Sequence, residues 1–130
     1  MEMYRIDNLI KEIMNGIREV KRKLYEQDFI DEYQRILLQK KLSDLNQKLL
    51  NCQKIKNRLI EINSKIRYLR AKWAKLEAEL DNEKDPNKII EIVKKIKDIK
   101  KYITSLECEK SSLDYQINTI ENDIDDSMER

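Results

Sequence analysis

Residues 81–106 read DNEKDPNKIIEIVKKIKDIKKYITSL and contain the two signals on which the predicted architecture depends. The second half of this stretch repeats an isoleucine or leucine at alternating steps of three and four residues: Ile89, Ile92, Ile96, Ile99, Ile103 and Leu106. Such alternation places every member on one side of a helix, at the a and d positions of a heptad repeat. The stripe continues to Ile124, interrupted only at Lys110, and predicts a helix over residues 86–126.

The first half of the same stretch contains a helix boundary. Asp85 is a favourable N-cap residue, and Pro86 suits the first helical position because proline there gives up no backbone donor that the helix needs. Pro86 is also the only proline in the chain. We therefore expect one helix to end before Asp85 and another to begin at Pro86, so that the two fold back on each other as an antiparallel hairpin.

The chain before this boundary carries the partner stripe of the hairpin. Its apolar residues form two runs: Leu38, Leu42, Leu45, Leu49 and Cys52, then Ile55, Leu59, Ile62, Ile66, Leu69, Trp73, Leu76 and Leu80. Cys52 and Ile55 lie three apart where both are d positions, which is a stammer that locally overwinds a coiled coil. We expect a helix over residues 31–82 and a hairpin centred near 83–84, which places 106 opposite about 61.

The first residues predict a further helix, over residues 3–27. Its stripe consists of Met3, Ile6, Ile10, Ile13, Ile17, Val20 and Leu24. Asp31 and Gln34 form a modified capping box, which indicates that the next helix begins at residue 31 after a turn near 27–31. No glycine or proline enforces that turn, so a continuous helix is the alternative. We expect the first helix to fold back over about residues 31–52.

Composition agrees with an all-α fold. The chain of 130 residues is 40% charged, has a mean hydropathy of −0.79, and contains one glycine and one proline, too few for the tight turns of a sandwich or barrel. The prediction is a single elongated coiled-coil domain over residues 1–130, a hairpin or helical bundle. Its core and oligomer seam is expected at Ile10, Ile17, Leu42, Leu49, Leu59, Ile66, Leu69, Trp73, Ile96, Ile103 and Ile117.

Several apolar residues lie outside this stripe: Leu9, Met14, Ile36, Leu37, Leu50, Ile60, Ile90, Val93 and Tyr102. They widen each stripe toward the broader apolar face of a bundle helix, and a lone hairpin leaves many of them in water. Self-association is therefore expected, with a dimer favoured. The sequence leaves open whether the first helix packs in its own chain or on a neighbour, and it identifies no other protein partner.

Groups for chemistry are missing from the sequence. It has no histidine, no glycine-rich phosphate loop and no paired-cysteine motif, since Cys52 and Cys108 lie far apart. The acidic stretch at 81–85 lacks the glycine and bidentate glutamate of a calcium loop. We expect no enzyme, no catalytic residue, no cofactor and no metal, with Cys52 buried and Cys108 exposed. No apolar stretch approaches a membrane span, and a cytoplasmic, reducing location is expected.

Charge is unevenly distributed although the formal net charge is only +2. Residues 39–75 carry a net +9 and residues 107–130 a net −6, which favours antiparallel pairing. Where 65–75 face 92–102, both sides of the hairpin are basic. The candidate belt for an anionic partner, here called the basic belt, is Lys65, Arg67, Arg70, Lys72, Lys94, Lys95, Lys97, Lys100 and Lys101. The alternative is that these residues only keep the helices soluble.

These observations favour a non-catalytic structural or adaptor protein that mediates protein–protein interaction and self-association within a larger assembly. A nucleic-acid-associated coiled coil that uses the basic belt is the alternative. In its periodicity the chain also resembles the helical hairpins of secretion-export stalks and membrane-trafficking scaffolds. That resemblance implies a helical scaffold and carries over no functional residue.

Overall fold

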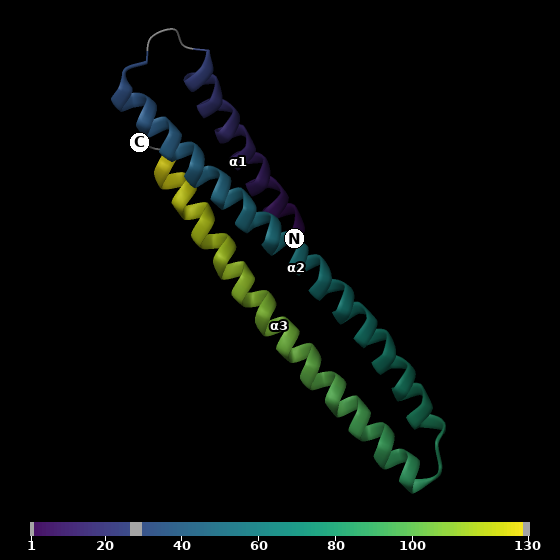
Figure 1. The fold of residues 1–130 in the computed structure, drawn as a ribbon. Coiled ribbons are helices and arrows are strands. Elements are labelled where there is room, and N and C mark those ends of the chain that lie inside the picture. The colour runs from purple at the N-terminus through teal and green to yellow at the C-terminus, as the bar shows by residue number, and fades with distance from the viewer. Residues whose placement is uncertain (1, 27–29, 129–130) are drawn as a thin grey trace. The chain divides into compact units, whose positions relative to one another are not determined.

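The computed structural model describes residues 2–26 and 30–128. They form three helices, α1 (Glu2–Tyr25), α2 (Glu32–Asn82) and α3 (Pro86–Met128), as Figure 1 shows, and the described residues contain no strand. The all-α prediction is confirmed, and each helix begins and ends within two residues of its predicted bounds. The predicted end of the first helix, residue 27, lies outside the described residues, and α1 ends at Tyr25. A helix continuous from α1 into α2 is wrong, because residue 26 and residues 30–31 are not helical.

The two predicted caps explain where α2 and α3 begin. Asp31 accepts a hydrogen bond from the backbone N–H of Gln34 at 2.7 Å, which satisfies one donor of the first turn of α2. Asp85 accepts one from the N–H of Asn87 at 3.0 Å, and Pro86 occupies the first position of α3. In the connection between α2 and α3, the Glu83 carboxylate accepts bonds from the N–H groups of Lys84 and Asp85.

The chain forms two compact units. The first contains the described residues of 1–57 and 114–130, and the second contains residues 58–113. Both α2 and α3 contribute to each unit, whereas α1 belongs to the first alone. The border after residue 57 comes two residues after Ile55, where the sequence predicts a stammer. The expectation of a single domain stays a prediction.

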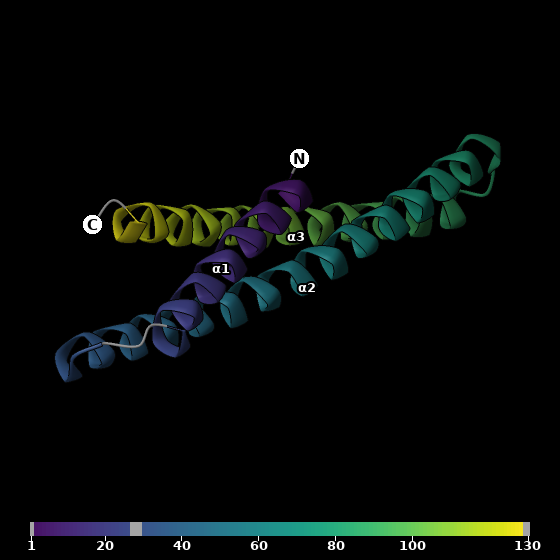
Figure 2. The same cartoon turned by 90° about the horizontal axis from the view of Figure 1, so that it is seen from above.

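In the first unit α1 runs back along the early part of α2, as Figures 1 and 2 show. The Nζ of Lys56 lies 2.6 Å from a carboxylate oxygen of Asp7, so the start of α1 lies beside residue 56 of α2. The guanidinium of Arg5 donates two hydrogen bonds, of 2.8 and 3.0 Å, to the carboxylate of Glu121 on α3. The first helix therefore packs in its own chain and contacts both other helices.

Contact with two helices changes which face of α1 is buried. Ile10, placed in the predicted stripe, is half-buried, whereas Leu9, placed outside it, is only 2% exposed. The buried residues of α1 are Ile6, Leu9, Ile13, Ile17 and Val20. A strict a and d stripe suits one neighbouring helix, and a helix with two neighbours needs a wider apolar face. The predicted position of Ile10 in the core is corrected accordingly.

The second unit is an antiparallel hairpin around the connection at residues 83–85. Its core cluster consists of Leu76, Ile92, Ile96, Ile99 and Ile103, with Leu69, Trp73 and Leu80 partly buried against it. Arg58 on α2 forms an ion pair with Glu109 on α3, which agrees with a hairpin centred near residues 83–84. Each buried isoleucine contributes about 1.5–3 kcal/mol by leaving water, so this stripe holds the hairpin together.

Candidate interaction surfaces

The predicted seam residues are buried to different depths. Six are buried, namely Ile17, Leu59, Ile66, Ile96, Ile103 and Ile117. Five are half-buried, namely Ile10, Leu42, Leu49, Leu69 and Trp73. Packing within one chain covers most of the surface of these residues.

The apolar residues outside the stripe form a different set. All of them except Leu9 remain 45–67% exposed: Met14, Ile36, Leu37, Leu50, Ile60, Ile90, Val93 and Tyr102. Single exposed apolar residues are common on protein surfaces. Eight of them on a chain of this size leave apolar surface that packing within the chain does not use.

In the first unit, the single glycine of the chain helps to shape an open hollow. Gly16 and Val20 of α1, Leu38 and Leu45 of α2, and Ile124 of α3 line a space of about 400 Å³. Charged side chains stand around it, including Glu19, Lys23 and Lys41. The absence of a side chain at Gly16 keeps part of the space between the helices open.

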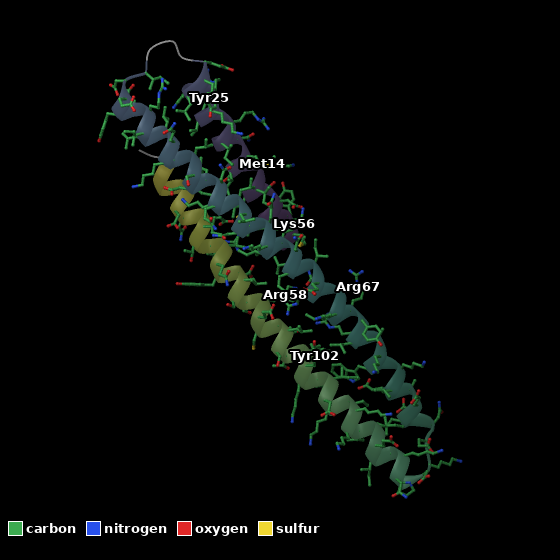
Figure 3. The ribbon with its side chains drawn as sticks, in the orientation of Figure 1. Met14, Tyr25, Lys56, Arg58, Arg67 and Tyr102 are labelled. Carbon is green, nitrogen blue, oxygen red and sulfur yellow. The ribbon has the colours of Figure 1, made fainter. Side chains whose placement is uncertain are left out.

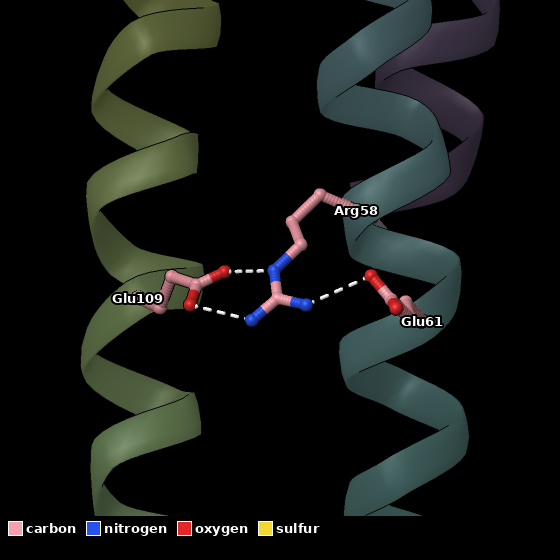
Figure 4. A network of polar contacts seen from close by, with 3 residues as sticks. All are labelled: Arg58, Glu61 and Glu109. Carbon is pink, nitrogen blue, oxygen red and sulfur yellow. Dashed lines mark hydrogen bonds and ion pairs between the residues drawn. The ribbon is translucent and has the colours of Figure 1, made fainter.

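In the second unit, one flank of the hairpin is closed by a three-residue network, shown in Figure 4. The guanidinium of Arg58 donates to both oxygens of Glu109 across the hairpin and, at 2.8 Å, to Glu61 on its own helix. These hydrogen bonds hold the pKa of Glu109 and of Glu61 below the ordinary value of 4.5 and raise that of Arg58. The network links α2 to α3 in the antiparallel register of the hairpin.

We expect Glu109→Gln to lower the melting temperature at pH 7, because the variant loses the charged pair with Arg58. A carboxylate with a lowered pKa stabilises the fold above the unfolded value and loses that effect as the pH falls through its folded pKa. The difference in melting temperature between the variant and the wild type should therefore become smaller below about pH 4.5. Thermal melts followed by circular dichroism from pH 3 to 7 measure this difference. The control is Glu91→Gln, because Glu91 forms its ion pair, at 3.7 Å, with Lys95 on the same helix. An equal loss in both variants would contradict the special role of Glu109.

All nine residues of the basic belt lie in the second unit, and all except the half-buried Lys65 are exposed. Three have partners within the unit: Arg70 with Glu107 at 3.2 Å, Lys95 with Glu91 at 3.7 Å, and Lys100 with the ring of Trp73 at 4.9 Å. Arg67 projects from α2 on the side away from α3, as Figure 3 shows. The belt thus surrounds the hairpin and does not form one continuous face.

One part of the belt is drawn together in a groove. Lys72 and Lys75 of α2 and Lys95 of α3 line a space of about 460 Å³ beside the exposed ring of Tyr68. Glu79 is the one acidic residue lining it. Lys72 and Lys95 occupy the same positions in the heptad register as Arg58 and Glu109, two heptads closer to the connection. Two positive charges therefore lie across the hairpin at the positions that correspond to the ion pair of Arg58 and Glu109. Lys75 is not among the residues of the predicted basic belt. Its spacing from Tyr68 and Lys72 nevertheless places all three on one helix face, which is a signal that the sequence contains.

The two cysteines lie as the sequence predicts. Cys52 is fully buried and Cys108 is exposed, and both are free thiols. Burial, with a smaller contribution from the negative charge of Glu121, raises the pKa of Cys52 to about 11. A thiol reacts as the thiolate, so Cys52 is protected by both burial and protonation.

A thiol reagent at pH 8 should therefore modify one cysteine of the folded chain rapidly and the second only after denaturant is added. A reagent that releases a chromophore on reaction with a thiol is used, and the absorbance of that chromophore measures both phases. The variant Cys108→Ser should lose the rapid phase and retain the slow one. A rapid phase that persists in this variant would contradict the burial of Cys52.

Among the described residues no group of three or more histidine, cysteine, aspartate or glutamate side chains is arranged to hold a metal ion. None of the described helices is long and apolar enough to cross a membrane. Comparison of the chain with protein-family models, with curated proteins and with solved structures found no match.

Proposed function

We propose that the chain is a non-catalytic structural or adaptor protein that self-associates, as a dimer in the first instance, and binds other proteins within an assembly. The observation that carries this proposal is that the eight apolar residues outside the stripes, named above, stay 45–67% exposed after the three helices have packed. Each is held on a helix, so contact with a second chain removes apolar surface from water at little further cost in backbone entropy.

The distribution of the buried residues supports the same proposal. They are aliphatic residues and Cys52, and the packing of α1 on α2 and of α2 on α3 accounts for them. What remains for function is the outer surface of the helices, where apolar residues alternate with charged ones. Two free thiols, one of them exposed at Cys108, suit a reducing compartment such as the cytoplasm.

Light scattering after size exclusion at tens of micromolar tests this proposal. A mass of twice 15.8 kDa is expected, together with a melting temperature that rises with protein concentration because association stabilises the folded chain. A monomer mass over the whole concentration range, with a constant melting temperature, would refute self-association.

A second candidate function rests on the groove beside Tyr68. Positive charge lies next to an exposed aromatic ring there, from Lys72, Lys75 and Lys95. Proteins that bind single-stranded nucleic acids combine these two features, since the charge attracts the backbone and the ring stacks on a base. As an alternative, the chain is a nucleic-acid-associated coiled coil that binds without sequence preference.

Fluorescence anisotropy of a labelled single-stranded oligonucleotide tests this alternative. Binding at low salt should weaken steeply as salt is added, since bound counterions are released on association. Replacing Lys72, Lys75 and Lys95 by glutamate should abolish it, whereas the same change at Lys40, Lys41 and Lys48 in the first unit serves as the charge-matched control. No binding by the wild type at low salt would remove this function.

A further inference from the structure

One flank of the hairpin in the second unit has an ordered arrangement of charge and apolar surface. On α3, Ile90, Val93, Lys97 and Lys100 follow at steps of three, four and three residues and so share one helix face. On α2, Arg70, Glu77 and Asp81 share a face in the same way. We call these seven residues the tip flank.

Contacts within the second unit bring the two faces together. Arg70 pairs with Glu107 at 3.2 Å, and Glu107 lies two turns beyond Lys100 on the same face of α3. The Nζ of Lys100 lies 4.9 Å from the centre of the Trp73 ring, and the indole N–H of Trp73 donates to Glu77 at 2.7 Å. The tip flank is therefore one surface, on the opposite side of the hairpin from the groove that holds Lys72 and Lys95.

Along this surface the residues follow the order acid, apolar, base. In the register set by Arg58 and Glu109, Asp81 is level with Pro86 and Arg70 is level with Lys97. Asp81 and Glu77 therefore lie toward the connection between the helices. Lys97, Lys100 and Arg70 lie at the other end, with Arg70 about 16 Å from Asp81 at 1.5 Å per residue. Ile90, which is 67% exposed, is level with Glu77, and Val93 lies between Glu77 and the basic end.

We infer that the tip flank binds a second copy of this chain, in an antiparallel arrangement about a two-fold axis that passes near Ile90 and Val93. This inference rests on the proposed self-association and names its surface. A surface ordered as acid, apolar, base is complementary to itself when rotated by a half turn. The apolar residues of the two copies then meet at the axis, and the acidic end of each copy covers the basic end of the other.

The order of charge along the tip flank favours a second copy of the chain over other binding partners. A polyanion such as a nucleic acid is attracted to Lys97 and Lys100 but repelled by Asp81 and Glu77 on the same face. A parallel arrangement of two copies places acid against acid and base against base. The antiparallel pairing of two copies instead places the acidic end of each tip flank against the basic end of the other.

Two matched variants of the full chain test the location. Ile90→Asp should weaken dimerisation at least about tenfold, because it places a charge at the apolar centre of the interface. Ile36→Asp changes an isoleucine of similar exposure in the first unit and tests the competing apolar surface there; if the tip flank is the interface, this variant keeps the wild-type dimer constant. Both residues are exposed, so circular dichroism should show unchanged helicity. Sedimentation equilibrium measures the constants.

A charge exchange tests the orientation. Neither Asp81 nor Lys97 forms an ion pair within the described residues, so each can be reversed without breaking one. Asp81→Lys alone and Lys97→Glu alone should each weaken dimerisation, about threefold or more, through like charges across the axis. An equimolar mixture of the two variants should form a heterodimer about as strong as the wild type, because each reversed charge then faces its opposite.

The outcomes separate this inference from the proposed function. If the wild type dimerises while Ile36→Asp disrupts the dimer and Ile90→Asp does not, the tip flank is the wrong surface and self-association stands. If Ile90→Asp disrupts it but the mixture is no stronger than either charge variant alone, the antiparallel pairing is wrong. If the wild type is a monomer throughout, both the proposed function and this inference fall.

Discussion

Replacing Ile96 by aspartate is expected to unfold the hairpin of the second unit. The side chain is 8% exposed and lies in the cluster with Leu76, Ile92, Ile99 and Ile103. The variant loses the apolar packing of an isoleucine and places a carboxylate among aliphatic groups with no partner. The expected loss is about 3–5 kcal/mol, a large part of the 5–15 kcal/mol that stabilises a typical small domain. Leu69→Asp, at a partly buried position, should act in the same direction with a smaller loss.

Two signals measure this outcome. Circular dichroism at 222 nm follows helicity during thermal melting, and the emission of Trp73, the only tryptophan, follows the core cluster that it packs against. Ile60→Asp is the control, since it changes the same residue type in the same unit at a position that is 49% exposed. Surface changes of this kind usually cost within about 0.5 kcal/mol. Unchanged helicity, melting and emission in Ile96→Asp would show that the proposed core stripe is wrong.

The helices were predictable because their signals are local. The a and d spacing depends only on positions along one chain, and the caps at Asp31 and Asp85 act within a few residues of themselves. The hairpin register was predictable because the helix break near residues 83–85 fixes the centre of an antiparallel pair, and the ion pair of Arg58 with Glu109 agrees with that centre. Local rules therefore determine both the elements and the order in which they pair.

The burial on α1 was not predictable in the same way. Periodicity assigns one seam to a helix, and the sequence does not show that Arg5 and Asp7 engage α3 and α2 at once. That double contact buries Leu9 in place of Ile10. A search for a second apolar diagonal, from Ile6 through Leu9 to Ile13, would have indicated the wider face.

The candidate surfaces were also predictable only in the features that depend on one segment of the chain. Composition located the basic belt, because nine charges in two short segments are visible in the sequence. Composition did not show that Lys100 covers Trp73 or that Lys72 and Lys95 share a groove, since both depend on side chains from two helices meeting in space. The order of charge along the tip flank likewise becomes visible only once α2 and α3 are aligned.

Replacing Ile13 by aspartate is expected to release α1 while the second unit stays folded. Ile13 is fully buried in the first unit, and a carboxylate there costs about as much as one at Ile96. Detached, the 24 residues of α1 form a helix that is only marginal in water, so helicity should fall. Trp73 lies in the second unit, and its emission and melting should stay close to the wild type. Met14→Asp, the adjacent and exposed position, is the control and should change neither signal. If the Trp73 emission instead shifts in step with the loss of helicity, the two units unfold as one, and the separation of the chain at residues 57 and 113 has no energetic meaning.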